Sequence, residues 1–177
     1  MFNEFSKLVL DRQSCRNFND KPLDKETIDK IVTLALNTPS ACNSQPWKMY
    51  VVTEENMRKE VASAVQDTFM NKFVDKAQAF IVVADTDAKL APGASLKFAK
   101  NHFVKYDVGE LVAYLTLGAE SLGVSSCIIG WVNQKKLQTV IPFGENEVSN
   151  IVIALGYSDI EKRKKSRKDK AEKVVYL

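Results

Sequence analysis

The segment Lys162–Lys170, KRKKSRKDK, holds the densest charge in the chain. It contains seven of the 25 Lys and Arg residues and one of the 22 acidic residues, so the rest of the 177-residue chain is mildly acidic. Within it, Lys165, Ser166 and Arg167 combine two cations with a hydroxyl. This is the chemistry of a phosphate site, because Arg binds phosphate through paired hydrogen bonds and Lys acts as a point charge. A solvated tail or a nucleic-acid arm is the alternative, although nucleic-acid-binding proteins usually spread such charge over a whole face.

Two other segments carry groups that suit a bound small molecule. In Arg12–Arg16, RQSCR, two guanidinium groups flank an amide and a hydroxyl. In Thr38–Trp47, TPSACNSQPW, two prolines restrict the backbone around Asn and Gln side chains, which each offer donors and an acceptor. Such a rigid loop suits a flat heterocycle with alternating N–H and C=O groups. Taken alone, the first segment also fits a solvated arginine face, and the second fits an ordinary polar turn.

A fourth segment, Ser125–Trp131, ends a buried apolar run with a glycine. Because Gly130 lacks a Cβ, its backbone could approach a ligand closely. A glycine at the end of a strand also simply permits a turn, and this is the alternative.

Helices and strands that interleave without a regular repeat must position these segments. Apolar spacing predicts a first helix that ends near Arg12, and Asp24 is the predicted N-cap of a helix that reaches about Asn37. The acidic start of EENMRKEVASAV is typical of a helix, and NQKKLQTVI is predicted to form a short one. The predicted strands are Trp47–Thr53, Ala79–Asp85, Val124–Trp131 and Val148–Tyr157. We therefore expect one α+β domain over residues 1–177, a sandwich in which helices cover a small mixed β-sheet.

The longest helix is predicted to start at Asp107, whose spacing to Glu110 matches a capping box, and to end before Gly123. Apolar residues leave this helix almost no polar face, so it must be buried. Gly109 and Ala113 would let another helix approach closely. A central core helix and a helix packed across a homodimer interface both fit this pattern.

Composition excludes several classes of chemistry. The single histidine, His102, rules out a histidine-rich metal site and a catalytic triad with a choice of base. The three cysteines are far apart and form no CxxC pair, which is typical of free thiols in a reducing compartment. Cys15 and Cys42 lie within the two polar segments, as small loop-filling residues or as redox-sensitive thiols. Because we see neither a signal peptide nor an apolar run of about 20 residues, we expect a cytoplasmic protein with no membrane partner.

Together and in this order, the segments resemble the nitroreductase family of FMN-dependent oxidoreductases. The shared features are RxSxR, then PSxxNxQPW, an apolar helix with DxGxL and LGAESLG, a glycine after the next strand, and GY followed by KSR. The resemblance runs from about Leu8 to Val175. It implies an α+β homodimer with exchanged terminal segments and two FMN sites at the subunit interface.

The resemblance also assigns residues to the parts of FMN. It implies phosphate and ribityl contacts from Arg12, Ser14, Lys165 and Arg167, with Gln13 and Arg16 nearer the ring. In the family the polar loop comes from the partner subunit, and the strand-end segment lies along the flavin face or its N5 edge. The residues concerned are Pro39, Ser40, Ala41, Asn43 and Gln45 in the loop, and Ile128, Ile129 and Gly130 in the strand-end segment. Hydride transfer requires no protein acid or base, so we expect no catalytic residue, and we expect no metal site.

The activity that the resemblance implies is an oxidoreductase cycle. Hydride passes from NADH or NADPH to flavin N5, and electrons then pass to a nitroaromatic, a quinone or a similar electron-poor acceptor in a ping-pong cycle. Residues 86–106 are shorter than the matching part of longer family members, so the sequence indicates no particular acceptor. Two alternatives stay open: a flavin-binding redox sensor or partner-binding module without turnover, and a family branch with dehalogenating or flavin-destroying chemistry. No nucleic-acid partner is expected.

Overall fold

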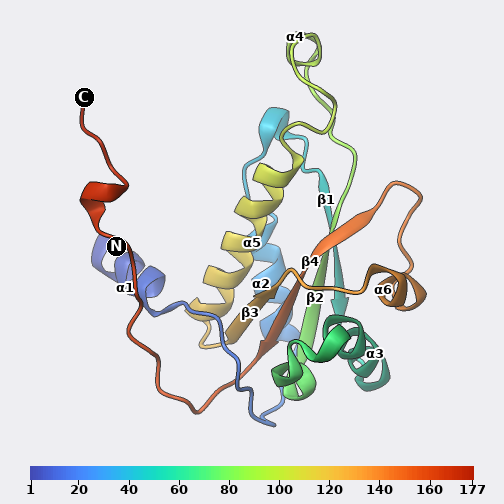
Figure 1. Cartoon of the computed structure of the whole chain (residues 1–177), viewed down its shortest axis with the longest axis vertical. Coiled ribbons are helices and arrows are strands. Elements are labelled where there is room, and N and C mark those ends of the chain that lie inside the picture. The colour runs from blue at the N-terminus through green and yellow to red at the C-terminus, as the bar shows by residue number, and fades with distance from the viewer.

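A four-stranded sheet forms the centre of the computed structural model, which describes residues 1–177. The strands lie in the order β1 (Trp47–Val52), β2 (Ala79–Asp85), β4 (Val148–Gly156) and β3 (Ser125–Ile129) (Figure 1). The three ladders are antiparallel, and the parallel component of the expected mixed sheet is a single bridge between Ser14 and Ser126. Helices lie on both faces of the sheet, which confirms the expected α+β class.

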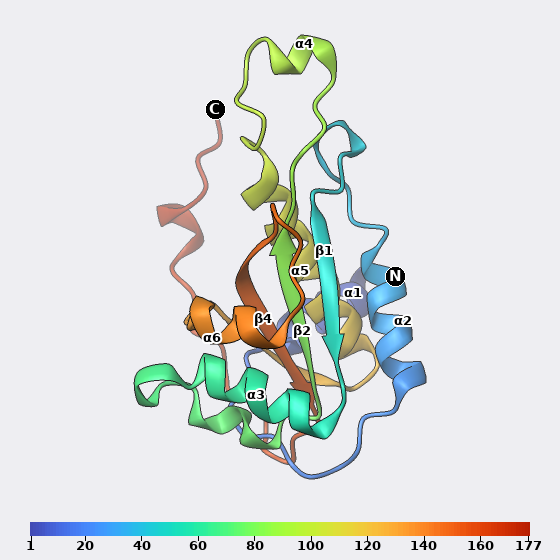
Figure 2. The ribbon, with the colours of Figure 1, turned by 90° about the vertical axis from the view of Figure 1, so that its right-hand side faces the viewer.

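One helical layer consists of α2 (Lys25–Ala35) and α5 (Val104–Ser121), which pack against each other and against one face of the sheet (Figure 2). Ile81, in the central strand β2, is fully buried on this side. The start of α2 follows its sequence signal, because Asp24 Oδ1 accepts a hydrogen bond of 2.7 Å from the Thr27 N–H.

The long helix α5 differs from its predicted start. It begins at Val104, three residues before Asp107, and no side chain caps its first turn. Asp107 lies inside the helix and is 5% exposed, so its carboxylate makes a tertiary contact and not a cap. The end of the helix is as predicted, because Gly123 follows with φ of +72°. One stripe of the helix, which includes Gly109 and Ala113, is buried by no part of this chain.

The second helical layer consists of α3 (Glu55–Val65) and α6 (Gln134–Val140), on the other face of the sheet. Each starts with a side-chain cap. The carboxylate of Glu54 accepts two backbone N–H groups of α3, and Asn133 Oδ1 accepts one of α6 at 3.1 Å. Phe80 in β2 is buried on this side. Because successive side chains of a strand point to opposite faces, β2 contributes residues to two separate cores.

Short elements connect these layers. They are η1 (Ala41–Asn43), η2 (Asp67–Phe69), η3 (Lys72–Lys76), α4 (Pro92–Ser95) and η4 (Lys170–Glu172). The segment between β2 and α5 extends beyond the sheet with α4 at its tip. His102 lies in this segment, is exposed, and stacks on Phe98 with the ring centres 5.0 Å apart. None of the helices is both long enough and apolar enough to cross a membrane.

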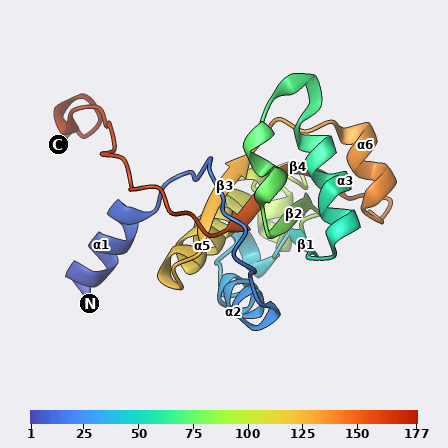
Figure 3. The same ribbon diagram turned by 90° about the horizontal axis from the view of Figure 1, so that it is seen from below.

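The two chain ends form one arm that lies apart from the sheet (Figure 1, Figure 3). Helix α1 (Phe2–Asp11) has no buried residue, and the C-terminal segment runs beside it. Lys165 Nζ joins the two by donating to the Val9 carbonyl at 2.6 Å. Phe2 and Phe5 remain exposed, so the arm presents apolar surface that this chain does not cover.

Candidate functional site

A cavity of about 380 Å³ lies between the end of α1 and the C-terminal segment. Nine residues line it, none of them hydrophobic: Arg12, Gln13, Ser14, Arg16, Arg163, Lys164, Lys165, Ser166 and Arg167. All six residues that were expected near the phosphate, the ribityl chain and the adjoining ring edge belong to this set. The Arg163 N–H also donates to Gln13 Oε1 at 3.3 Å across the cavity wall. The fold thus brings the RQSCR and KSR segments, from opposite ends of the chain, to one place.

Backbone pairing fixes the RQSCR side of the cavity. Helix α1 ends at Asp11, and the chain becomes extended at Arg12. Ser14 then pairs with Ser126 of β3, and the Cys15 N–H donates to the Ser126 carbonyl at 2.8 Å. The guanidinium-bearing segment is therefore anchored to the edge of the sheet.

Close packing at the end of β4 fixes the C-terminal side. A Cβ added at Gly156 would lie 2.9 Å from Phe18 Cδ1, so only glycine lets the two segments approach this closely. The Asn19 N–H then donates to the Tyr157 carbonyl at 2.8 Å. This contact sets the direction in which the chain leaves the sheet and returns past the cavity.

The cavity gathers positive charge, and no acidic side chain lines it. Burial lowers the pKa of Arg12, and the nearby charge of Arg167 acts in the same direction. Burial also lowers the pKa of Lys165, with Arg167 and Arg12 adding to the effect. Arg12 Nε is buried and has no hydrogen-bond partner. Because cations line the cavity without any carboxylate, it suits an anion with several acceptor oxygens.

A second cavity, of about 250 Å³, adjoins the first on the side of β3. Gln13, Ser14 and Arg16 line both cavities, and Cys15 lines the second. At its rim an ion pair between Glu120, in the last turn of α5, and Lys162 holds the C-terminal segment against the helix.

Side-chain oxygens from within and outside the loop hold the polar loop before β1. Ser40 Oγ accepts a hydrogen bond of 2.9 Å from the Gln45 N–H, within the loop. Asp107 Oδ1 of α5 accepts one of 3.1 Å from the Ala41 N–H. The other carboxylate oxygen, Asp107 Oδ2, is buried without a partner. The expected ring-binding loop therefore rests on a buried carboxylate 66 residues away.

The same loop has a strained backbone. Cys42, Asn43 and Gln45 have φ of 55°, 50° and 47°, in the left-handed region that residues other than glycine rarely adopt. The segment that extends beyond the sheet supports this conformation, because the Ala91 N–H donates to Cys42 Sγ at 3.4 Å. Tertiary contacts, and not the prolines alone, determine the shape of the loop.

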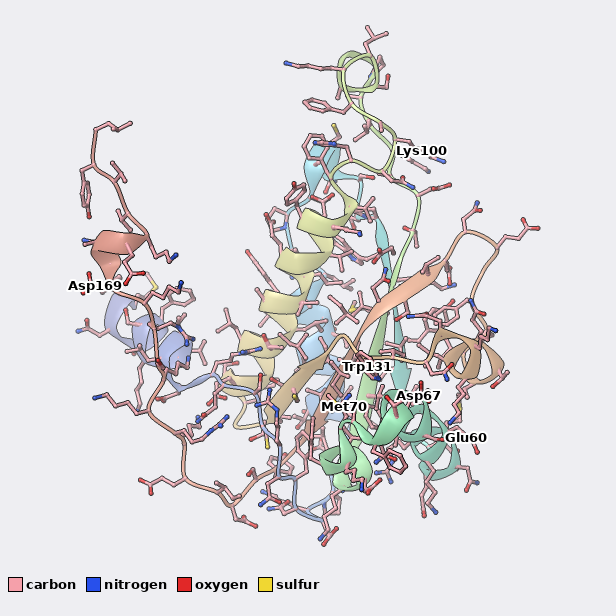
Figure 4. The ribbon with its side chains drawn as sticks, viewed as in Figure 1. Glu60, Asp67, Met70, Lys100, Trp131 and Asp169 are labelled. Atoms are coloured by element: carbon pink, nitrogen blue, oxygen red, sulfur yellow. The ribbon has the colours of Figure 1, made fainter.

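The strand-end segment, Ser125–Trp131, lies at the end of β3. Ile128 is 37% exposed, whereas Ile129 is buried, so only the backbone of Ile129 can face a ligand. A Cβ at Gly130 would meet nothing within 4 Å, so packing inside this chain does not require a glycine there. The next residue, Trp131, donates its indole N–H to the Asp67 carbonyl at 3.2 Å, and Figure 4 labels both residues beside η2.

A single chain does not bring all the expected groups together. The loop is bonded to Asp107 near the start of α5, whereas the charged cavity lies near Glu120 at the other end. The residues between these two positions correspond to about 20 Å of helix, and Figure 1 shows α5 running along the sheet. The two halves expected to hold one ligand therefore lie at opposite ends of one helix.

The structure adds residues that the sequence pattern did not single out. Arg163 and Lys164 also line the charged cavity, next to the three KSR residues that the sequence pattern had singled out. Within a run of Lys and Arg residues, the residue types alone do not indicate which further side chains turn toward a ligand. Asp107 supports the loop, although its spacing to Glu110 suggested a cap. The near-complete burial of Asp107 indicates its tertiary role, and this burial could not be predicted from the local sequence pattern.

A family model described as "Nitroreductase family" matches residues 9–157. The chain belongs to the nitroreductase family. A protein of Archaeoglobus fulgidus with the provisional name NADH dehydrogenase/NAD(P)H nitroreductase is 31% identical over 163 residues, which are 90% of this chain and 88% of that protein. The nitroreductase family match ends just before the C-terminal segment, so the KSR side of the cavity lies outside the matched residues.

Two crystal structures share the nitroreductase fold of this chain. A nitroreductase family protein from Streptococcus pneumoniae has a TM-score of 0.85 and 23% identity, covering 98% of this chain and 100% of that chain. A nitroreductase with bound FMN from Desulfitobacterium hafniense has a TM-score of 0.77 and 20% identity, covering all of both chains. Unlike the family match, these likenesses extend over the arm as well.

Proposed function

We propose that this protein is an FMN-dependent oxidoreductase that takes hydride from NADH or NADPH. The observation that carries the proposal is the cavity without hydrophobic or acidic lining, where Arg12, Lys165 and Arg167 come together from opposite ends of the chain. A phosphate monoester has three acceptor oxygens and up to two negative charges, so it fits this cavity. Family membership and the FMN that the Desulfitobacterium hafniense nitroreductase binds support the same ligand.

The position of each cavity residue indicates which part of FMN it would contact. Arg12, Lys165 and Arg167 would hold the phosphate through charge-assisted hydrogen bonds, each of which contributes about 1.5–3 kcal/mol. The Ser14 hydroxyl can donate one more hydrogen bond. Gln13 and Arg16 line both cavities, so they would follow the ligand from phosphate and ribityl chain toward the ring, where a guanidinium stabilises negative charge.

We propose that a second copy of the chain completes the site. The loop of Pro39, Ser40, Ala41, Asn43 and Gln45 would then reach the cavity of the partner, with Ile128, Ile129 and Gly130 along the ring. Three features support this arrangement: the separation of the two halves along α5, the uncovered stripe at Gly109 and Ala113, and the arm with its exposed Phe2 and Phe5. A homodimer whose terminal arms cross over would bury the stripe and the arm, and would bring a loop and a cavity from different chains together.

When bound, FMN supplies the two-electron chemistry that takes hydride from NADH or NADPH and passes electrons to a nitroaromatic, a quinone or a similar acceptor. The side chains of this chain bind the ligand, orient it and balance its charge. None of the residues assigned to the site is placed as a proton donor or acceptor for the reaction, so the proposal includes no catalytic acid or base.

The test compares two double variants of the C-terminal segment. Lys165→Ala with Arg167→Ala removes two cations of the cavity, whereas Lys168→Ala with Lys170→Ala removes two cations outside it. The first variant should lose FMN during gel filtration, and the second should retain it as the wild type does. Visible flavin absorbance measures retention, and anaerobic bleaching with NADH or NADPH measures reduction. Equal FMN loss in both variants, or a wild type that cannot be reconstituted with FMN, would overturn the proposal.

A further inference from the structure

Two of the three free cysteines lie side by side where the RQSCR segment meets the sheet. The parallel bridge pairs Ser14 with Ser126, and so the next positions, Cys15 and Cys127, stand opposite each other. The Cys15 N–H donates to the Ser126 carbonyl at 2.8 Å, which holds this register. Paired strands lie about 4.7–4.9 Å apart, and the Cα atoms of a disulfide are usually about 4.4–6.8 Å apart.

The side chains share one environment. Cys127 is part of the apolar core between the sheet, α3 and α6, and Cys15 packs against the edge of that core. Burial raises the pKa of the Cys127 thiol; Arg16 opposes this effect, and the nearby Cys15 thiol adds to it. The pairing beside them is a single bridge, so the segment after Cys15 is not fixed by a continuing ladder and can adjust toward β3.

We propose that Cys15 and Cys127 form a reversible disulfide, with hydrogen peroxide as the oxidant. The two thiols differ in access in the way such a pair requires. Cys15 is partly exposed and lines the 250 Å³ cavity, so a small oxidant dissolved in that cavity reaches it first. Cys127 is 2% exposed, so dissolved oxidant does not reach it, and it reacts with the oxidised sulfur of Cys15.

The reaction balances in two steps. The Cys15 sulfur attacks one peroxide oxygen, the O–O bond breaks, and the sulfenic acid of Cys15 forms with release of one water. The Cys127 sulfur then attacks the Cys15 sulfur, the S–O bond breaks, and the departing hydroxide leaves with the thiol proton as a second water. Two thiols and one peroxide become one disulfide and two waters. A small dithiol reverses the oxidation by thiol–disulfide exchange.

The bond has a consequence for the charged cavity, and this part rests on the proposed function. Cys15 lies between Ser14 and Arg16, which line both cavities. Drawing Cys15 toward β3 would misalign those two side chains. We expect the oxidised protein to bind FMN about tenfold to 150-fold more weakly, the loss that corresponds to one charge-assisted hydrogen bond.

The test uses FMN-reconstituted protein that is oxidised with hydrogen peroxide, blocked with iodoacetamide and digested with trypsin without reduction. The proposal expects a cross-linked pair of peptides, Gln13–Arg16 joined to Tyr106–Lys135, that disappears after dithiothreitol. Cys42→Ser should keep the cross-link, because Cys42 lies in the other loop, and Cys15→Ser and Cys127→Ala should each abolish it. Folding of each variant is checked by circular dichroism, and Cys15→Ser, at the partly exposed position, tests the pair even where Cys127→Ala fails to fold.

The outcomes separate the two proposals. Peptides that carry only sulfenic or sulfinic acid on Cys15, or a cross-link that needs Cys42, would overturn the disulfide. A cross-link that leaves FMN affinity unchanged would overturn the coupling to the cavity. A wild type that binds no FMN before oxidation would overturn the proposed function and leave the cross-link as a separate result.

Discussion

Removing the carboxylate of Asp107 should release the polar loop before β1. In Asp107→Ala the Ala41 N–H loses its acceptor, a contact of 3.1 Å to a side chain that is 5% exposed. A buried donor left without a partner costs about 1–3 kcal/mol, and this partly buried contact should lie within or below that range. The loop then has less to hold its left-handed residues, whose backbone strain is of order 1–3 kcal/mol each. Hydrogen exchange at the Ala41 amide should accelerate by up to about 150-fold, and by about five-fold where the loss is about 1 kcal/mol.

Amide exchange followed by NMR or by mass spectrometry checks this value, at fixed protein concentration because a dimer would otherwise shift the result. Asp107→Asn keeps an oxygen at the same position, so Ala41 should stay protected as in the wild type. The Lys136 N–H, which donates to Asn133 Oδ1 at 3.1 Å on the other face of the sheet, is a control amide that should not change in either variant. The reasoning is refuted if Asp107→Ala leaves Ala41 protected, or if Asp107→Asn exposes it equally.

Three further changes test other parts of the structure. The backbone N–H at the start of α2 holds the pKa of Asp24 below its ordinary value, so the stabilisation by this cap is present above that value and is lost as the pH falls through the folded-state pKa. Asp24→Asn still caps the helix but does not titrate in this range. Below about pH 4 its urea midpoint of unfolding should therefore fall less steeply with decreasing pH than that of the wild type. Gly156→Ala should destabilise the fold by about 1–3 kcal/mol through its clash with buried Phe18, whereas Gly130→Ala should melt like the wild type. Ala113→Glu, on the uncovered stripe of α5, should give a monomer by light scattering that releases FMN, and a dimer that retains it would contradict the proposed interface.

Local signals predicted the elements well, because each depends on residues close in sequence. Asp24 caps α2 and Gly123 ends α5, since a cap or a left-handed turn is decided within a few residues. The start of α5 was wrong because a distant amide, that of Ala41, binds the Asp107 carboxylate. The strand order could not be derived, because β2 pairs with β4 across a long stretch of chain that no local pattern specifies.

For the candidate site, too, local sequence predicted one part and the tertiary structure was needed for the other. Residue types in RQSCR and KSR indicated phosphate chemistry, and the fold places those residues around one cavity. The position of Cys15 opposite Cys127 follows from the Ser14 bridge, which joins distant segments and leaves no mark in composition or spacing. Chemistry could therefore be predicted from residue types, whereas which groups become neighbours required the tertiary structure.

Helix α5 carries the loop at one end and borders the charged cavity at the other, which makes the proposed dimer open to complementation. A chain defective in the loop, such as Asp107→Ala, still has a sound cavity, and a chain lacking Lys165 and Arg167 still has a sound loop. When two such defective proteins exchange subunits, each heterodimer has two sites. One site joins the sound cavity to the sound loop, and the other site carries both defects. Random pairing of equal amounts would restore roughly a quarter of all sites.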